Sequence, residues 1–301
     1  MRLPQVAIVT LAMGLNGPAQ AAIDLANFDL SVKPEADFFH YVNGTWLKNT
    51  PIPAEFSSWG SFTELAERNR ANLRRICERA AANSNATGVE KMVGDLYASG
   101  MDEARIEALG AKPLQPQLDR IAAIKERADL LPALAHLHES GVGAAFSFGS
   151  SPDLKDSTRE LAQFSQGGLG LPERGYYFNA DEKGQKIRQQ YVAHIANMFT
   201  LLGDSRDSAS VSATAVMALE TKLAVAALAR VQLRDPYRSY HKMTLVNALT
   251  KVPQLDLRSY LAARKIAPLT DVNLAHQEFF QGLERAMTEV ALADWKAYLR
   301  W

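Results

Sequence analysis

Most of the chain has the spacing of hydrophobic and polar positions that amphipathic helices show. Apolar residues recur three and four positions apart in the stretches 61–81, 87–100, 181–203, 207–233 and 244–251. Ser61 with Glu64 has the spacing of a capping box. Gly203 follows the last apolar position of its stretch, where helices commonly end. The pattern therefore predicts a mainly α fold.

The second of these stretches carries the same start and stop signals. Thr87 and Glu90 repeat the capping-box spacing, and Gly100 stands where the helix is expected to end. These local signals agree with the periodicity, so the helical prediction rests on two independent features of the sequence.

One interval departs from the helical pattern. Residues 144–150 and 158–166 alternate between apolar and polar, and a turn-rich segment, 151–157, separates them. The following stretch, 167–178 (GGLGLPERGYYF), contains glycines and a proline that disfavour regular structure. We therefore expect a multi-helix lobe with one small antiparallel strand pair and an irregular loop after it.

The N-terminus has the features of an export signal. Met1-Arg2 precedes a short apolar run, and Ala19-Gln20-Ala21 has the small-x-small pattern of a cleavage site. We expect residues 1–21 to be a signal peptide cleaved before Ala22, which leaves residues 22–301 as a periplasmic or secreted protein. Cys77 is the single cysteine, so no internal disulfide is expected.

Composition restricts the partners. The 301 residues are 47% hydrophobic, with Lys+Arg 33 against Asp+Glu 33, which allows a large core and gives no support for a nucleic-acid partner. No segment after residue 21 is apolar enough to predict a membrane span. The final stretch, 292–301 (LADWKAYLRW), predicts an aromatic amphipathic helix. We expect Trp295 and Trp301 to lack a partner within the chain, which would make the isolated protein marginal or self-associating.

The segment HLHES, residues 136–140, raises the question of a zinc site. Asp129 and Gly141 bound a predicted helix, and on a helix His136 and His138 point about 200° apart, so they cannot hold one ion. We expect one half-buried and one exposed histidine. Among the other histidines, His40, His194, His241 and His276 are isolated, so no catalytic and no metal-ligating residue is predicted from motifs.

Several blocks carry a resemblance to a known family. Residues 37–65 (DFFHYVNGTWLKNTPIPAEFSSWGSFTEL) resemble the N-terminal signature of the neprilysin and endothelin-converting-enzyme family of zinc metallopeptidases. The resemblance continues, in order, through the blocks FSFGSSPDLKDS, QGGLGLPERGYYF, ALETKLA, RDPYRSYHKMT and LADWKAYLRW. It covers almost everything after the predicted signal peptide.

The resemblance implies a function for this region and also implies that the catalytic lobe is missing from this sequence. In the family, this region supplies most of a helical lobe that covers the active site and filters substrates by size. The catalytic lobe follows and holds zinc through an H-E-x-x-H helix, which does not occur in this sequence. The resemblance thus implies Zn²⁺ and peptide substrates for the full-length family, acting through a catalytic lobe missing here, and no zinc bound to this chain.

Two positions bear on substrate choice. Some members carry an arginine and an aspartate that position a substrate's C-terminus, and here Ser58 and Thr63 occupy the matching positions. The resemblance therefore favours an endopeptidase of oligopeptides over a carboxydipeptidase. Two alternatives stay open: a non-enzymatic helical module that binds peptides or a partner, and a gene fragment or frame-shifted product with no function of its own.

Overall fold

Helices dominate the computed structural model, which describes residues 23–301. The predicted signal peptide, residues 1–21, and its cleavage site lie outside the described residues. The chain divides into two compact units, one up to Glu103 and one from Ala104 onward, and each is described by itself.

Unit 1 consists of helices with little interior. Its helices are α1 (Phe38–Asn49), α2 (Ser61–Ala82) and α3 (Gly88–Met101). Helices α2 and α3 meet at Gly94, where a Cβ atom would lie 2.5 Å from the backbone oxygen of Ala80, so only glycine permits this approach. Within residues 23–103 the buried residues are Gly44, Ala80 and Gly94. Unit 1 therefore has no hydrophobic core of its own.

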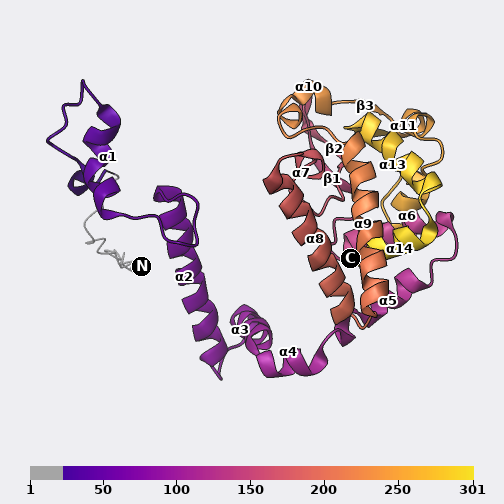
Figure 1. The fold of residues 1–301 in the computed structure, drawn as a ribbon, viewed down its shortest axis with the longest axis horizontal. Coiled ribbons are helices and arrows are strands. Elements are labelled where there is room, and N and C mark those ends of the chain that lie inside the picture. The colour runs from indigo at the N-terminus through magenta and orange to yellow at the C-terminus, as the bar shows by residue number, and fades with distance from the viewer. Residues whose placement is uncertain (1–22) are drawn as a thin grey trace, which may run out of the picture. The chain divides into compact units, whose positions relative to one another are not determined.

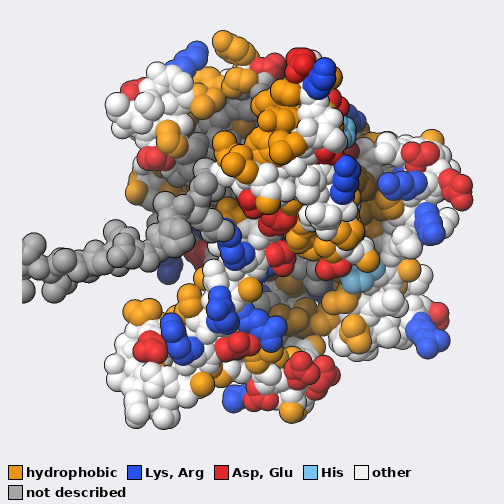
Figure 2. Space-filling view, turned by 90° about the vertical axis from the view of Figure 1, so that its left-hand side faces the viewer, with side chains coloured by type: hydrophobic (Ala, Val, Ile, Leu, Met, Phe, Trp, Pro, Cys, Tyr) orange, Lys and Arg blue, Asp and Glu red, His pale blue; other side chains and the backbone are white. Residues whose placement is uncertain are grey.

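Helices α2 and α3 have the predicted apolar faces, but the side chains on these faces are exposed to solvent. Leu73 and Ile76 on α2, and Met92 and Leu96 on α3, are all exposed. Hydrophobic side chains are visible at the surface on the face drawn in Figure 2. A lone apolar residue at a surface is ordinary, but such faces on two adjacent helices are typical of a surface that binds a partner.

Unit 2 contains the remaining helices and all the described strands. Helix α4 (Glu103–Leu109) leads into it. The other helices are α5 (Gln115–Ala122), α6 (Leu130–Glu139), α7 (Gly175–Phe178), α8 (Glu182–Leu201), α9 (Arg206–Ala226), α10 (Pro236–Ser239), α11 (Leu245–Lys251), α12 (Leu257–Ala263), α13 (Gln277–Glu289) and α14 (Leu292–Arg300). The strands are β1 (Phe146–Asp153), β2 (Asp156–Gln166), β3 (Lys242–Thr244) and β4 (Asp271–Leu274).

The sheet corrects the predicted strand pair. Strands β1 and β2 do form the expected antiparallel pair, with Phe148 opposite Phe164. The sheet nevertheless has four strands in the order β1-β2-β4-β3, and β4 runs parallel to β2. The prediction missed β3 and β4 because strands of three and four residues are too short to show alternation. Parallel pairing between distant segments also leaves no local signal.

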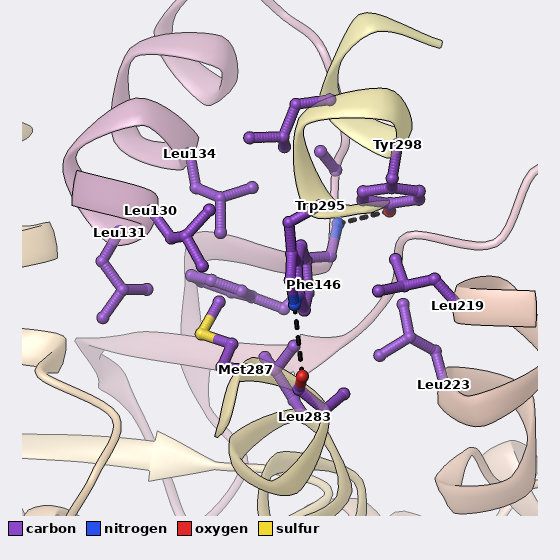
Figure 3. Close-up of a cluster of buried hydrophobic side chains, with 14 of the residues drawn as sticks. Leu130, Leu131, Leu134, Phe146, Leu219, Leu223, Leu283, Met287, Trp295 and Tyr298 are labelled. Atoms are coloured by element: carbon purple, nitrogen blue, oxygen red, sulfur yellow. Dashed lines mark hydrogen bonds between the residues drawn. The ribbon is translucent and has the colours of Figure 1, made fainter. Parts of the chain in front are cut away.

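The core of unit 2 surrounds Trp295. This side chain is fully buried among Phe146, Leu130 and Leu134, and its indole N–H donates to the backbone oxygen of Ala286 at 3.2 Å (Figure 3). Helix α9 runs beside α8 (Figure 1) and also packs against α13 and α14. The expectation that the terminal helix lacks a partner is therefore wrong.

The other aromatic residues of α14 are also accommodated within unit 2. Tyr298 is buried, and its hydroxyl accepts from the backbone N–H of Ala145 at 2.7 Å and donates to the Gly168 oxygen at 2.8 Å. Trp301 is half-buried against Tyr191. Unit 1 exposes apolar side chains on both α2 and α3, where we did not expect them.

Helix ends show where local signals failed. The stretch 207–233 is not one helix: α9 ends at Ala226, and a 3-10 turn, Gln232–Arg234, follows. The helix stops because the N–H of Leu228 donates to the side chain of Gln166 at 2.8 Å instead of to a carbonyl one turn back. Helix α8 ends near Gly203 as expected, and that glycine has φ +99.

Both predicted capping boxes are wrong. Helix α2 starts after Gly60 without a side-chain cap, and the Glu64 carboxylate accepts from two tryptophans instead. Thr87 occupies the N-cap of α3 without a side-chain cap, and the Glu90 carboxylate accepts from the Asn83 side chain instead of from Thr87. The same helix runs one residue past its expected end at Gly100.

One described helix passes the test for a membrane span by length and composition, contrary to expectation. Helix α9 is long and apolar enough to cross a membrane. Seven of its residues are buried against other elements of unit 2. Core helices of globular domains meet the same criterion, so this helix is weak support for a membrane segment.

Candidate functional site

The segment that carries Ser58 and Thr63 is held by a cluster of aromatic residues. Ser58 is exposed in the loop before α2, and Thr63 is half-buried in the first turn of that helix. Beside them, the Glu64 carboxylate accepts from the indoles of Trp46 and Trp59, each at 3.2 Å. The carboxylate thereby ties the loop to α1, so both hydroxyl side chains sit on a braced segment.

The chemistry available at this segment is hydrogen bonding without charge. Neither the Ser58 nor the Thr63 side chain has a hydrogen-bond partner among residues 23–301. A hydroxyl can donate to a peptide carbonyl or accept from a peptide N–H. Hydroxyls give much weaker recognition of a terminal carboxylate than a guanidinium does. The segment is therefore suited to binding a peptide backbone.

The HLHES segment is not a metal site. Nε2 of His138 donates to the Ala144 oxygen at 2.8 Å, which leaves Nδ1 to accept from the Tyr260 hydroxyl at 2.7 Å. Burial lowers the pKa of His138, so this ring is neutral at physiological pH. His136 pairs with Gln117 at 2.8 Å. Both histidines are half-buried, which corrects the expectation that one would be exposed.

A serine–histidine contact elsewhere in unit 2 does not form a nucleophile and base. His276 accepts from the backbone N–H of Gln166 through Nδ1 at 3.0 Å. The proton of the neutral ring must then reside on Nε2, which donates to the Ser239 hydroxyl at 3.2 Å. A general base must accept the serine proton, so the contact has the wrong polarity. Burial lowers the pKa of His276, which keeps the ring neutral.

Zinc does not fit the residues that the structure describes. Between residues 23 and 301, no group of three or more histidine, cysteine, aspartate or glutamate side chains converges. His138 and His276 use both ring nitrogens in hydrogen bonds to the protein. A zinc site needs three or four ligands at about 2.0–2.3 Å. No chemical step through a metal can be derived for these residues.

The most unusual polar group is a buried carboxylate that sequence analysis missed. Glu220 on α9 is 1% exposed. It accepts from the Tyr177 hydroxyl at 2.6 Å and from the Tyr191 hydroxyl at 2.9 Å. Fixed N–H donors complete the cluster, because Leu171 donates to Tyr177 and Trp301 donates to Tyr191. Each tyrosine therefore directs its own proton at the carboxylate.

The cluster has no cation, so burial dominates its electrostatics. Burial raises the pKa of Glu220, and the hydrogen bonds from the two tyrosines offset part of that rise. Burial also raises the pKa of both tyrosines. A sequence signal was available, since a lone glutamate interrupts the apolar positions Val216, Leu219 and Leu223 on one helix. The cluster anchors the loop 167–178 to α8 and α9.

The loop 167–178 lines two adjoining pockets of about 480 and 640 Å³. Residues of the segment 227–233 line both pockets as well. Sequence analysis missed these pockets because the two lining segments lie about 60 positions apart. The two pockets offer room for a ligand, and the Ser58 segment offers accessible polar groups.

Comparison with known proteins shows which family this chain resembles. The sequence profile of peptidase family M13, for the N-terminal region, matches residues 34–301. The chain is 33% identical to endothelin-converting enzyme 1 of Rattus norvegicus over 249 residues, which is 79% of this chain and 32% of the rat protein. It is 30% identical to neprilysin-3 of Drosophila melanogaster over 231 residues, or 73% of this chain and 29% of that protein.

A solved structure gives the same result. The zinc metalloprotease ZMP1 of Mycobacterium tuberculosis, solved in complex with an inhibitor, matches with a TM-score of 0.82 and 34% identity. The match covers 93% of this chain and 43% of the mycobacterial chain. The chain thus spans about a third of the length of the curated relatives and less than half of this solved chain.

Proposed function

This chain belongs to peptidase family M13, the zinc metallopeptidase family of neprilysin and endothelin-converting enzyme, and we propose that it is the N-terminal part of an exported zinc metalloendopeptidase that acts on oligopeptides. One observation carries the proposal: residues 34–301 match the N-terminal region of the family, while the sequence contains no H-E-x-x-H segment. In this proposal the chain binds and admits peptides, and zinc chemistry belongs to a lobe without a counterpart in these 301 residues.

The exposed apolar faces of unit 1 support a role inside a larger assembly. A region without its own core gains stability when a partner covers its apolar surface. In the proposed enzyme the braced loop at Ser58 and Thr63 contacts the peptide backbone. Because neither position is charged, the enzyme cleaves within oligopeptides without selecting for a free C-terminus at that segment.

Export is part of the proposal and has its own test. The Ala-Gln-Ala pattern before Ala22 supports cleavage there. N-terminal sequencing of the exported protein should begin at Ala22, whereas exported material that still begins at Met1 would refute the assignment.

The test of the enzymatic proposal begins with the DNA that follows the codon for Trp301. An H-E-x-x-H coding region there, in phase or frame-shifted, supports the proposal. Its product should then be produced together with this chain. We expect the two polypeptides to copurify and to cleave a bradykinin-sized peptide in a chelator-sensitive manner. A copurified pair without such cleavage would refute the proposal.

A second candidate is a non-enzymatic module that binds peptides, and the pockets beside the loop 167–178 favour it. Their two arginines, Arg174 and Arg230, have no carboxylate partner among the described residues, so the pockets offer a site for a ligand. A stable exported product whose gene lacks any downstream H-E-x-x-H region would favour this module over the enzyme.

A further inference from the structure

The two pockets beside the loop 167–178 form one braced groove. The side-chain amide of Gln166 makes two bonds to Leu228, accepting from its N–H at 2.8 Å and donating to its oxygen at 3.1 Å. Further along, Nε of Arg174 donates to the oxygen of Ala224 at 3.2 Å. These bonds join the loop to the segment that follows α9. The groove is therefore formed before a ligand arrives, which reduces the entropy lost on binding.

The groove combines apolar walls with a charged centre. Leu171, Leu228 and Leu233 line the first pocket, and Phe178 and Val231 line the second. Val231 is 76% exposed, so apolar surface lies open to a ligand. Glu173, Arg174 and Arg230 border both pockets and stand where the two pockets meet.

Among the described residues, none of the three charged groups at the centre forms an ion pair. Arg230 is exposed and makes no ion pair or hydrogen bond among residues 23–301. Arg174 uses only Nε, and its guanidinium lies over the Phe178 ring at 5.5 Å, so both Nη groups are free to donate. Glu173 is half-buried, and the described residues give its carboxylate no donor. Two positive charges and one negative leave a net charge of one positive.

We propose that this groove binds the C-terminal end of an extended peptide, with the terminal carboxylate on Arg174 and Arg230 and an apolar last side chain in the Leu171–Leu228 pocket. From the proposed function the inference takes only that the ligand is a peptide. Guanidinium groups match a carboxylate geometrically, because two parallel N–H donors meet its two oxygens.

The charge balance selects this occupant over other anions. One carboxylate neutralises the single net positive charge, whereas a nucleic acid or a polyacidic segment brings more charge than two arginines can match. Glu173 repels a second acidic group and accepts a backbone N–H from the peptide. The apolar walls then favour a hydrophobic C-terminal residue. The groove is thus a site for anchoring a peptide end, and none of its lining residues is Ser58 or Thr63.

The test uses the purified mature chain and a fluorescein-labelled octapeptide that ends in Phe-Leu with a free carboxylate. Fluorescence anisotropy should show this peptide binding roughly 10-fold or more tightly than its C-terminal amide, since a charge-assisted pair is lost. Arg230→Gln should remove that preference and leave binding of the amide unchanged. Arg174→Gln should remove the same preference and also weaken binding of the amide, because it loses the bond to Ala224 that braces the groove; a thermal melt verifies that this variant folds.

Arg234→Gln is the matched control, because this exposed arginine follows Arg230 by about one turn and lines neither pocket. It makes the same change in charge and should bind like the parent protein. Equal binding of acid and amide would overturn the inference, and so would no binding at millimolar peptide or equal losses in Arg230→Gln and Arg234→Gln. A peptide amide with an internal glutamate that binds as tightly as the free acid would show recognition of a side chain and overturn it as well.

This outcome is separable from that of the proposed function. Carboxylate-dependent binding to a chain whose copurified pair cleaves nothing would refute the enzyme and keep the groove. If the copurified pair cleaves peptides but the acid and the amide bind equally, the enzyme proposal stands and the groove inference is refuted.

Discussion

The buried carboxylate of Glu220 gives a prediction that depends on pH. Burial raises its pKa above the usual value of 4.5. Below pH 4.5 the folded and unfolded states both hold the proton. As pH rises, the unfolded chain releases its proton first, so the unfolded state gains stability until the pH passes the folded pKa. Glu220 therefore contributes stability at low pH that is lost as pH increases.

Glu220→Gln removes this titration without changing the side chain's shape. The rest of the cluster stays neutral over the same range, because burial raises the pKa of Tyr177 and Tyr191 further above 10. The free energy of unfolding of the parent, minus that of the variant, should fall from about pH 4.5 upward. The slope has a ceiling of about 1.4 kcal/mol per pH unit.

The variant also carries a hydrogen-bond mismatch that does not depend on pH. The amide N–H₂ of glutamine faces a tyrosine hydroxyl that already points its proton at this position, and such a mismatch costs about 1–3 kcal/mol. This constant offset does not alter the slope. The pKa of His138 and of His276 is lowered, so the contribution of each to the free energy of unfolding decreases as pH falls. These contributions are the same in the parent and the variant and cancel in the difference.

Urea unfolding followed by tryptophan fluorescence between pH 4.5 and 8 measures the difference. Glu289→Gln serves as the control, because its carboxylate is exposed and reaches only one lysine at 3.9 Å. A difference between the parent and Glu220→Gln that stays flat, or rises with pH, would refute the reasoning.

Further predictions concern packing, backbone and specificity. Trp295→Ala should lower the free energy of unfolding by about 3–5 kcal/mol in urea titrations, because the side chain is fully buried; a loss below about 1 kcal/mol would contradict its place in the core. Gly168→Ala should cost about 1–3 kcal/mol, because this glycine has φ +74 and a Cβ atom would lie 2.5 Å from the Ala145 backbone. The control Gly143→Ala meets nothing within 4 Å and should be near neutral. In the copurified enzyme, Ser58→Arg with Thr63→Asp should shift cleavage toward release of C-terminal dipeptides by roughly 10-fold, measured by mass spectrometry of products; an unchanged product pattern would remove these positions from the peptide site.

Sequence predicted the parts of the fold that depend on local periodicity. The α2, α8 and α11 stretches and the first strand pair follow from apolar spacing and turn residues, and all are present. The end of α9 could not be predicted, since Leu228 leaves the helix to bond with Gln166, 62 positions earlier. Long-range hydrogen bonds determine such helix ends, and the spacing of apolar residues does not predict these bonds.

The candidate sites divide in the same way. The family blocks indicated Ser58 and Thr63, and the structure places both on one braced segment without testing their role. The Glu220 cluster draws donors from α7, α8 and the end of α14, so no single stretch contained it. In the two predicted capping boxes, the Glu64 and Glu90 carboxylates bond to the side chains of Trp46, Trp59 and Asn83 and not to a helix N-terminus.

The central proposal is that this chain, a member of peptidase family M13, is part of a zinc peptidase and supplies none of its zinc chemistry. Metal analysis of the tag-free mature chain, paired with a peptidase assay on a bradykinin-sized peptide with and without a chelator, tests it directly. The account predicts no stoichiometric zinc and no cleavage. One equivalent of tightly bound zinc together with chelator-sensitive cleavage would contradict it.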